Sequence, residues 1–169
     1  MSRTIYVSSL FEMHRWVRAH RPSHLISVIQ HELQPSCPEE ISPQCHLRLG
    51  VDDISEPMPD LVMPGQADVA ALIDFLGGWR PADGSLLVHC YAGISRSTAC
   101  ALIAHVMQTK DPERSVAALA TASPHARPNR RIIALADSLL GYNGALSAAR
   151  AAMPEGLPAV EAPLTVFTL

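Results

Sequence analysis

The stretch from Ser85 to Thr98, SLLVHCYAGISRST, constrains the fold more than any other part of the chain. Leu86 to Val88 form a short apolar run that is typical of a buried strand. Residues 99–107, which follow, are apolar nearly all round, as in a central buried helix. A tight loop that contains Cys90 and Arg96 lies between the two runs. We therefore expect a strand that turns directly into a buried helix, with a thiol at the turn.

The residue types in this loop suit the binding of an anion. Backbone N–H groups of such a loop point inward, and the dipole of the following helix adds positive potential. The same field stabilises a thiolate, so we expect the pKa of Cys90 to lie well below the roughly 8.5 of a free cysteine. Arg96 offers a planar fork for two phosphate oxygens, and Gly93 lets the loop turn where a β-carbon would clash. The loop predicts a site that binds an anion and attacks it with sulfur.

Residues 89–97, HCYAGISRS, resemble the signature loop of the cysteine-dependent protein tyrosine phosphatases, and are most similar to that of the small dual-specificity branch. The resemblance implies that the Cys90 thiolate attacks phosphorus and forms a phosphocysteine intermediate. Ser97 is then expected to hydrogen-bond the sulfur, and His89 to hydrogen-bond the loop backbone. Groups that stabilise the phosphate oxygens would be the Arg96 side chain and the backbone N–H groups of Tyr91, Ala92, Gly93, Ile94, Ser95 and Arg96.

An acidic segment supplies the second part of the predicted site. Cleavage of a phosphate ester expels an oxygen that needs a proton. In the phosphatases that this chain resembles, the donor is an aspartate on a loop after the strand that precedes the signature strand. Asp53 lies 37 residues before Cys90 (90 − 53), and the family's Val-x-Asp ending favours it over Asp52, whose side chain would point the opposite way. The alternative is that the two carboxylates only end an edge strand.

A basic cluster at residues 125–131, HARPNRR, is the third candidate segment. In the resembling family a loop with a Pro-Asn pair lies beside the phosphate pocket, so Arg127 and Asn129 are candidate substrate-side residues. A solvated basic face is the alternative. Pro128 is predicted to open a helix that ends at Gly141 and turns these residues inward: Ile132, Leu135, Ala136 and Leu139.

Segments typical of strands and helices alternate along the rest of the chain. Strands are expected at residues 5–7, 25–29 and 46–51. One helix is expected between Ser9 and Pro22, where Ser9 and Glu12 fit a capping box with Leu10, Met13 and Val17 on the inner face. A second helix is expected to begin at Gln66 and to be ended by Gly77-Gly78, and a third to open at Pro112 and to end near Ser123-Pro124. This order predicts an α/β fold in three layers. A central, mostly parallel sheet of four or five strands would carry helices on both faces, with the phosphate loop between a central strand and a buried helix.

The length of 169 residues favours one domain over 1–169. Its core is expected at about residues 1–142. Residues 143–169 loosen into Ala, Gly and Pro and are predicted to form a docked or flexible tail. The apolar end of this tail would dock on its own domain or on a second copy of the chain, and the oligomeric state stays open.

Composition restricts the setting and the partners. A net charge of −3 argues against nucleic acid as a partner. The N-terminus lacks a secretory signal, and no run approaches a membrane span, so no membrane association is expected. Four cysteines are too few for a disulfide scaffold, and one of them is needed as a thiolate. A reducing, cytoplasmic setting fits best.

Cys37 and Cys45 leave two minor alternatives open. With His31 and His46 they could hold a metal, but their spacing matches no common zinc pattern. Alternatively, one of them could form a reversible disulfide with Cys90, because thiolates of low pKa oxidise first. Neither is needed for the predicted chemistry.

The predicted function is hydrolysis of phosphate monoesters without metal or cofactor, because Arg96 and the backbone dipoles supply the positive field. The expected substrate is a phosphorylated protein, with phosphotyrosine first and phosphoserine or phosphothreonine as further substrates, or a small phosphomonoester. Neutral Ala92 and Ile94 favour phosphoprotein over phosphoinositide. Two alternatives from other classes remain: a weakly active phosphopeptide-binding module on the same fold, and a thiol redox or arsenate-reductase-like protein.

Overall fold

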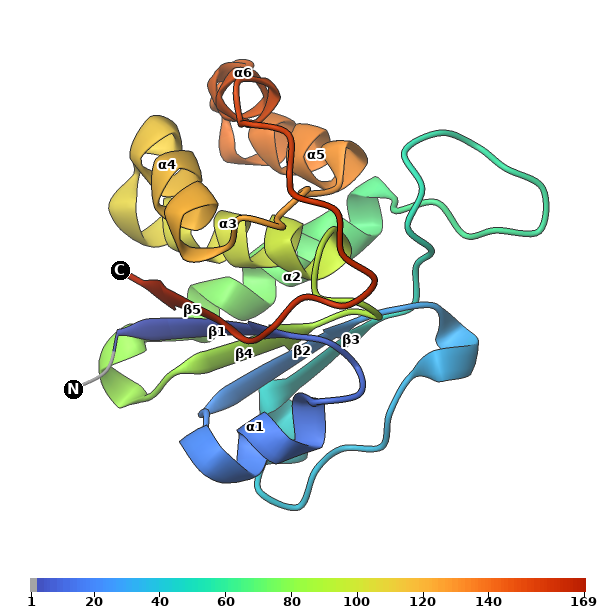
Figure 1. The fold of residues 1–169 in the computed structure, drawn as a ribbon, viewed down its shortest axis with the longest axis vertical. Coiled ribbons are helices and arrows are strands. Elements are labelled where there is room, and N and C mark those ends of the chain that lie inside the picture. Colours follow the sequence, from blue (N-terminus) through green and yellow to red (C-terminus); the bar gives the residue numbers. More distant parts are fainter. Residues whose placement is uncertain (1–2) are drawn as a thin grey trace.

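The structure is a computed structural model that describes residues 3–169 (Figure 1). Five strands and six α-helices follow one another in this part of the chain. They are β1 (Thr4–Ser8), α1 (Met13–His20), β2 (His24–Val28), β3 (His46–Leu49), α2 (Gln66–Gly78), β4 (Leu86–His89), α3 (Arg96–Thr109), α4 (Pro112–Ala122), α5 (Arg130–Leu140), α6 (Ala145–Ala151) and β5 (Thr165–Thr168). Within residues 3–169, none of the helices has the length and apolar character that a membrane crossing requires.

All five strands form one sheet, in the order β3-β2-β4-β1-β5. β1 to β4 run parallel to their neighbours, and β5 pairs antiparallel with β1. Helix α1 lies on one face of the sheet, and the other helices lie on the opposite face (Figure 1). This arrangement confirms the predicted three-layer α/β fold with a mostly parallel sheet.

The sheet separates two hydrophobic clusters. The larger cluster lies on the face of α2 and α3 and contains Ile26 and Val28 of β2. The smaller one lies against α1 and contains Leu25. Because side chains alternate along a strand, Ser27 lies on the same face as Leu25. A polar side chain is therefore buried beneath the sheet on the α1 side.

The central strand and the helix after it are the most deeply buried elements. All four residues of β4 are buried, and so is every residue of α3 from Arg96 to Val106. Helix α3 begins at Arg96, so the segment from Cys90 to Ser95 spans the gap between two buried elements. This confirms the predicted unit of central strand, loop and buried helix.

Helix α1 begins later than the capping box predicts. The Ser9 hydroxyl oxygen does accept the Glu12 N–H at 3.3 Å, but residues 10–12 form a turn and the helix starts at Met13. The reason is that other contacts occupy this segment. The Leu10 N–H donates to the Tyr91 carbonyl at 3.0 Å, and the Ser9 hydroxyl donates to the carboxylate of Glu161.

Helix α5 begins two residues after Pro128, which corrects the prediction that this proline opens it. Asn129 is the N-cap, and its side-chain oxygen accepts the Ile132 N–H at 3.0 Å. Leu139 is exposed, and Ile133 is buried in its place. Gly141, with φ of 75°, ends the helix as predicted.

The segment after residue 142 continues into α6 and β5. Leu146 of α6 and Phe167 of β5 are both buried in the larger cluster. Phe167 stacks on His105 of α3 with ring centroids 4.3 Å apart. Next to β5, the Leu169 N–H donates to the Arg3 carbonyl at 3.0 Å. Both ends of the described chain therefore meet at one edge of the sheet (Figure 1).

Candidate active site

The loop between β4 and α3 is held by hydrogen bonds to its carbonyl groups. Four backbone N–H groups from outside the loop donate to it: Leu10 to Tyr91 (3.0 Å), Ala162 to Ala92 (2.9 Å), Arg127 to Ile94 (2.9 Å) and Asn129 to Ser95 (3.1 Å). Within residues 3–169, no backbone carbonyl accepts a hydrogen bond from the N–H groups of Tyr91 to Arg96. With the carbonyls fixed on the outside, these N–H groups are free to bind an anion at the N-terminus of α3.

Gly93 has two reasons to be glycine. Its φ of 76° lies in the left-handed region, which residues with a β-carbon rarely adopt. A β-carbon on Gly93 would also lie 3.1 Å from the carbonyl carbon of Ser8 and 3.2 Å from the backbone nitrogen of Ser9. The loop therefore packs directly against the end of β1.

Cys90 is the first residue after β4, with only 3% of its surface exposed. Its sulfur lies 3.0 Å from the hydroxyl oxygen of Ser97, in the first turn of α3. A second cysteine, Cys100 of α3, is fully buried. Burial, together with the nearby Cys90, raises the pKa of the Cys100 thiol. Cys100 therefore stays protonated at neutral pH.

The guanidinium group of Arg96 is anchored along one side only. Its Nη1 donates to the side-chain oxygen of Gln30 at 2.8 Å and to the carbonyl of Val51 at 2.9 Å. Its Nε is buried and has no hydrogen-bond partner within the described residues. A buried donor without a partner is costly, so this side of the guanidinium is suited to receive an anion.

Asp53 lies against the loop, and Asp52 does not. One carboxylate oxygen of Asp53 accepts from the Ser95 hydroxyl at 2.6 Å and from the Asn129 side-chain amide at 2.9 Å. Asp52 instead accepts the Val62 N–H at 2.7 Å, and its own N–H donates to the Val62 carbonyl at 2.8 Å. Asp52 thus closes the base of the long segment between β3 and α2, which extends away from the body of the molecule (Figure 1). Of the two carboxylates, only that of Asp53 hydrogen-bonds a residue of the loop.

The two basic-cluster candidates take different positions. Asn129 is buried, caps α5, and donates to Asp53 and to the Ile54 carbonyl at 3.2 Å. Arg127 turns its guanidinium to the Gly156 carbonyl, with an Nε–O distance of 3.2 Å. Asn129 therefore connects α5 to the acidic segment, and Arg127 connects the loop to the C-terminal segment. The substrate-side role of either residue stays a prediction.

His89 lies beneath the loop, on the α1 side of the sheet. Its Nδ1 is 3.0 Å from the Cys90 carbonyl oxygen, and its Nε2 is 2.6 Å from the Ser27 hydroxyl oxygen. The side chain is fully buried, and burial lowers the pKa of His89 to about 4. At neutral pH the ring is uncharged and therefore donates Nδ1–H to the carbonyl.

Stability should fall as the pH falls, because burial lowers the pKa of His89 and of His46 from 6.5 to about 4. Below about pH 6.5 the unfolded chain takes up protons that the folded chain takes up only near pH 4, so the folded state loses stability across this window. We expect the urea midpoint of unfolding to be lower at about pH 5 than at about pH 7.5. His46→Gln should show a smaller drop than the wild type. Equal midpoints at both pH values in the wild type would contradict this prediction.

The other sulfur and imidazole groups do not form a second site. Within the described residues, no group of three or more His, Cys, Asp or Glu side chains is arranged to hold a metal ion. Cys37 and Cys45 pack against the smaller cluster on the α1 side, whereas Cys90 belongs to the larger one. All four cysteines are free thiols.

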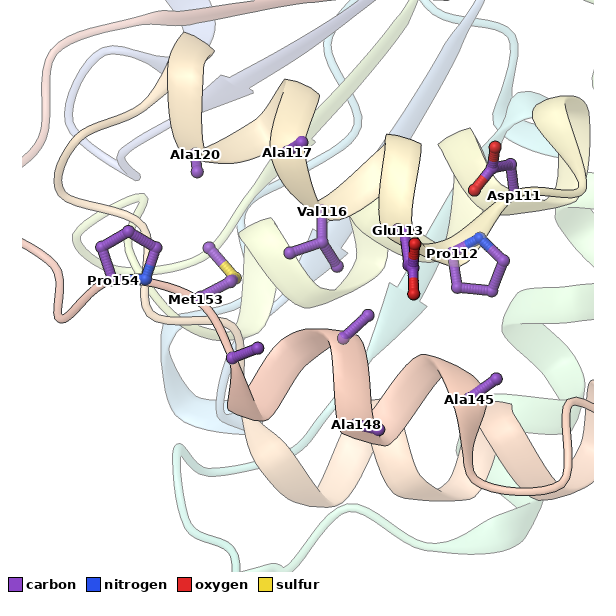
Figure 2. A pocket seen from close by; sticks show the side chains of 12 residues that line it. Asp111, Pro112, Glu113, Val116, Ala117, Ala120, Ala145, Ala148, Met153 and Pro154 are labelled. Carbon is purple, nitrogen blue, oxygen red and sulfur yellow. The ribbon is translucent and has the colours of Figure 1, made fainter.

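A cavity of about 640 Å³ lies between α4 and α6, away from the loop. Figure 2 shows small apolar side chains of the two helices facing it, among them Val116, Ala117, Ala145 and Ala148. Its charged side chains are two acids, Asp111 and Glu113. This cavity therefore has no cationic side chain that could pair with a phosphate.

No protein-family model matches the chain, and no curated protein sequence matches it. Solved structures of phosphatases and of a phosphatase-like protein do resemble it. The human tyrosine phosphatase-like serine/threonine/tyrosine-interacting protein is 17% identical, with 82% of this chain and 92% of that chain covered and a TM-score of 0.64. DUSP15 is 23% identical over 87% of this chain and 88% of that chain, with a TM-score of 0.59. PTPMT1, in complex with PI(5)P, is 17% identical over 89% of this chain and 96% of that chain, with a TM-score of 0.61. These similarities confirm that the chain has the fold of the dual-specificity phosphatases.

The sequence patterns did not reveal the contribution of Gln30 or of the Ser95 side chain. Gln30 follows β2 and fixes one side of Arg96, and the Ser95 hydroxyl binds the Asp53 carboxylate. A polar residue directly after the apolar run 25–29 was an available signal for Gln30, because the carboxyl ends of parallel strands meet at one edge of a sheet. Ser95 belongs to the predicted loop, but its side chain carried no separate signal.

Proposed function

We propose that this chain is a cysteine-dependent phosphatase that hydrolyses phosphate monoesters, first of all phosphotyrosine in proteins, through a phosphocysteine intermediate. One observation carries the proposal. The Cys90 thiol lies within a loop whose N–H groups are unused, beside an arginine whose buried Nε has no partner in the described residues. A nucleophile in the centre of a preorganised anion site is the arrangement that phosphoryl transfer to sulfur requires.

In the first step the Cys90 thiolate attacks phosphorus in line, and the bond from phosphorus to the leaving oxygen breaks. The three remaining phosphate oxygens are stabilised by the loop N–H groups and by the free side of Arg96. Asp53, as the carboxylic acid, gives its proton to the leaving oxygen. Its hydrogen bonds to Ser95 and Asn129 hold the carboxyl group at the edge of the loop.

In the second step water attacks the phosphorus of the phosphocysteine, and the Asp53 carboxylate takes a proton from that water. The sulfur–phosphorus bond breaks, and inorganic phosphate leaves. The Ser97 hydroxyl, 3.0 Å from the sulfur, is placed to donate a hydrogen bond to the departing thiolate. His89 takes no part in proton transfer, because its two nitrogens face the Cys90 carbonyl and Ser27.

The neutral side chains of Ala92 and Ile94 favour a phosphoprotein over a phosphoinositide. Two exposed aromatic rings support an aromatic substrate. Tyr91, next to the nucleophile, and Phe11 pack edge to face with centroids 5.2 Å apart, and they are 43% and 63% exposed. An apolar surface of this kind beside the anion site suits the ring of phosphotyrosine.

The direct test is turnover of p-nitrophenyl phosphate by the reduced full chain in the presence of EDTA. We expect hydrolysis that needs no added metal, and a phosphate trapped on Cys90 after rapid denaturation during turnover. A panel of phosphotyrosine, phosphoserine and phosphothreonine peptides and a phosphoinositide then ranks the substrate classes, with phosphotyrosine first. No turnover in reduced protein, or turnover that EDTA abolishes, would overturn the proposal.

Asp53→Ala should lower turnover about 100-fold or more for substrates with poor leaving groups, because these need the proton most. With p-nitrophenyl phosphate the loss should be smaller, since this leaving group departs without full protonation. The measurement is kcat for a series of aryl phosphates of increasing leaving-group pKa.

Asp52→Ala is the matched control for Asp53→Ala. It removes the adjacent carboxylate, whose hydrogen bond is to the Val62 N–H at the base of the segment. Its kcat should depend on the leaving group as in the wild type. If Asp52→Ala is instead the variant with the steeper dependence, the acid is Asp52.

A further inference from the structure

We propose that Ser27 and His46 are positioning residues for the Cys90 thiolate, and that they act through His89 along a chain of hydrogen bonds with one fixed direction. The proposal rests on the proposed role of Cys90 as a thiolate nucleophile. Neither residue lies in the signature loop, and neither contacts the sulfur.

Three neighbouring strands supply the chain of side chains. In the register of the sheet, Ser27 of β2 lies opposite His89 of β4. β3 is the neighbour on the other side of β2 (Figure 1), and its His46 pairs with Leu25, two residues before Ser27 and on the same face of the sheet. The Ser27 hydroxyl oxygen is 2.6 Å from His89 Nε2 and 2.8 Å from His46 Nε2. Ser27 and His89 are fully buried, and His46 is half-buried. No other side-chain hydrogen bond of Ser27 competes with this pair within the described residues.

The direction of each hydrogen bond follows from one acceptor. The Cys90 carbonyl can only accept, so the nitrogen 3.0 Å away, His89 Nδ1, carries the hydrogen. In the neutral ring Nε2 is then an acceptor, and it takes the Ser27 hydroxyl hydrogen. Since that hydroxyl has a single hydrogen, Ser27 must accept from His46, which therefore carries its hydrogen on Nε2. The chain runs from His46 through Ser27 and His89 to the carbonyl of the nucleophile.

This direction matters for the thiolate. The carbonyl oxygen of Cys90 is the negative end of a dipole close to the residue's own sulfur, and the donated Nδ1–H offsets that negative potential. Without the Ser27 hydroxyl, Nε2 of His89 becomes a buried acceptor with no donor. The hydrogen bond accepted at Nε2 polarises the imidazole and strengthens Nδ1–H as a donor, so its loss weakens the hydrogen bond from Nδ1–H to the Cys90 carbonyl. A weaker donated hydrogen bond leaves more negative potential at the carbonyl and destabilises the thiolate.

Burial and the surrounding charges keep both imidazole rings of this hydrogen-bond chain uncharged at neutral pH. His46 and Arg48 on β3, His14 on α1 and Arg96 on α3 are the groups whose positive charge acts on the two rings. Together with burial they hold the pKa of both His89 and His46 near 4. The two histidines therefore do not titrate in the range above pH 5, so a change seen there belongs to the thiol.

The test is the pH dependence of Cys90 alkylation by iodoacetamide in the full chain, followed at Cys90 by mass spectrometry. Only the thiolate reacts, so the midpoint of the rate reports the thiol pKa. We expect Ser27→Ala to raise this midpoint by about 0.5 to 1 pH unit, which makes alkylation about three- to tenfold slower below both midpoints. His46→Leu should shift the midpoint in the same direction. His46→Gln should restore it, because its amide can still donate to Ser27.

Ser115→Ala is the matched control, because it removes another buried hydrogen bond between a serine hydroxyl and a histidine ring, away from the loop. Ser115 lies 2.7 Å from His105 Nδ1, and His105 Nε2 lies 3.1 Å from the Thr168 carbonyl. Both residues are buried, and neither belongs to the loop. This variant should lose stability while the Cys90 midpoint stays as in the wild type.

A wild-type midpoint in both Ser27→Ala and His46→Leu would overturn the proposal, and so would an equal shift in Ser115→Ala. If Ser27→Ala does not fold, the alkylation midpoints of His46→Leu and His46→Gln are compared instead. Equal midpoints in these two variants would overturn the proposed chain of hydrogen bonds. Alkylation requires no turnover. A protein that fails to hydrolyse p-nitrophenyl phosphate but shows the shift overturns the proposed function alone, and the reverse outcome overturns only the role of Ser27 and His46.

Discussion

Cys90→Ser should hydrolyse p-nitrophenyl phosphate at least about 10⁴-fold more slowly than the wild type, because the nucleophile itself is removed. A serine hydroxyl ionises far above neutral pH, and the N–H groups that stabilise a thiolate cannot bring an alkoxide into that range. The two side chains are close in size, and Cys90 is almost fully buried, so the fold and the anion site should persist. The measurement is kcat together with the binding of inorganic phosphate, which should survive.

Cys100→Ala provides the control for the loss of a thiol. Cys100 lies in α3 within the same hydrophobic cluster, but burial keeps it protonated and it has no access to the loop N–H groups. Its turnover should stay near that of the wild type. Activity of Cys90→Ser above about one hundredth of the wild type would contradict a role of this sulfur as the nucleophile.

Arg96→Lys should lower kcat about 1,000-fold, although the positive charge is kept, because the transition state loses a bidentate donor. In the structure one side of the guanidinium is committed to Gln30 and Val51, which leaves its other side for the phosphate. A lysine ammonium is a single point charge, and it cannot bind these protein acceptors and the phosphate at the same time. If it binds the Val51 carbonyl, the phosphate loses its donor, and if it turns to the phosphate, two buried acceptors lose theirs.

Arg80→Lys is the corresponding control. Arg80 is exposed, pairs with Asp83 at 2.7 Å on the surface, and lies outside the loop. A surface pair of this kind contributes little, so its replacement should leave kcat and KM within about twofold. If Arg96→Lys were equally mild, the bidentate role of Arg96 would be wrong.

The parts of this fold that local sequence patterns encode were predictable. β2 and β4 are short apolar runs, and α3 is apolar nearly all round. A window of a few residues is therefore enough to predict that each of these elements is buried. β5 is different. Its pattern alternates, with Phe167 buried and Val166 exposed, and it lies at the end of a segment rich in Ala and Pro. It becomes a strand by pairing with β1, far away in the sequence, and no local pattern encodes such a pairing.

The same distinction separates the predictable and the unpredictable parts of the site. The loop is contiguous, so its thiol, glycine and arginine could be recognised together. Gln30 and Ser27 owe their positions to the register of β2 beside β4, which only the folded sheet establishes. Asn129 is a candidate substrate-side residue from its place in the sequence, and the structure shows in addition that its amide donates to the Asp53 carboxylate. Its contact depends on how α5 packs, which the spacing of residues along the chain does not define.

The C-terminal segment has a consequence for the order in which the protein becomes active during synthesis. The Ala162 N–H holds the Ala92 carbonyl, although 70 residues (162 − 92) separate them, and Glu161 holds Ser9. A nascent chain that has already exposed Cys90 and Arg96 from the ribosome still lacks this support for the loop and the edge strand β5. The Cys90 thiol is therefore synthesised about 70 residues before the segment that supports its loop. At about 5–20 residues per second of protein synthesis, the loop is without this support for an interval of several seconds or more.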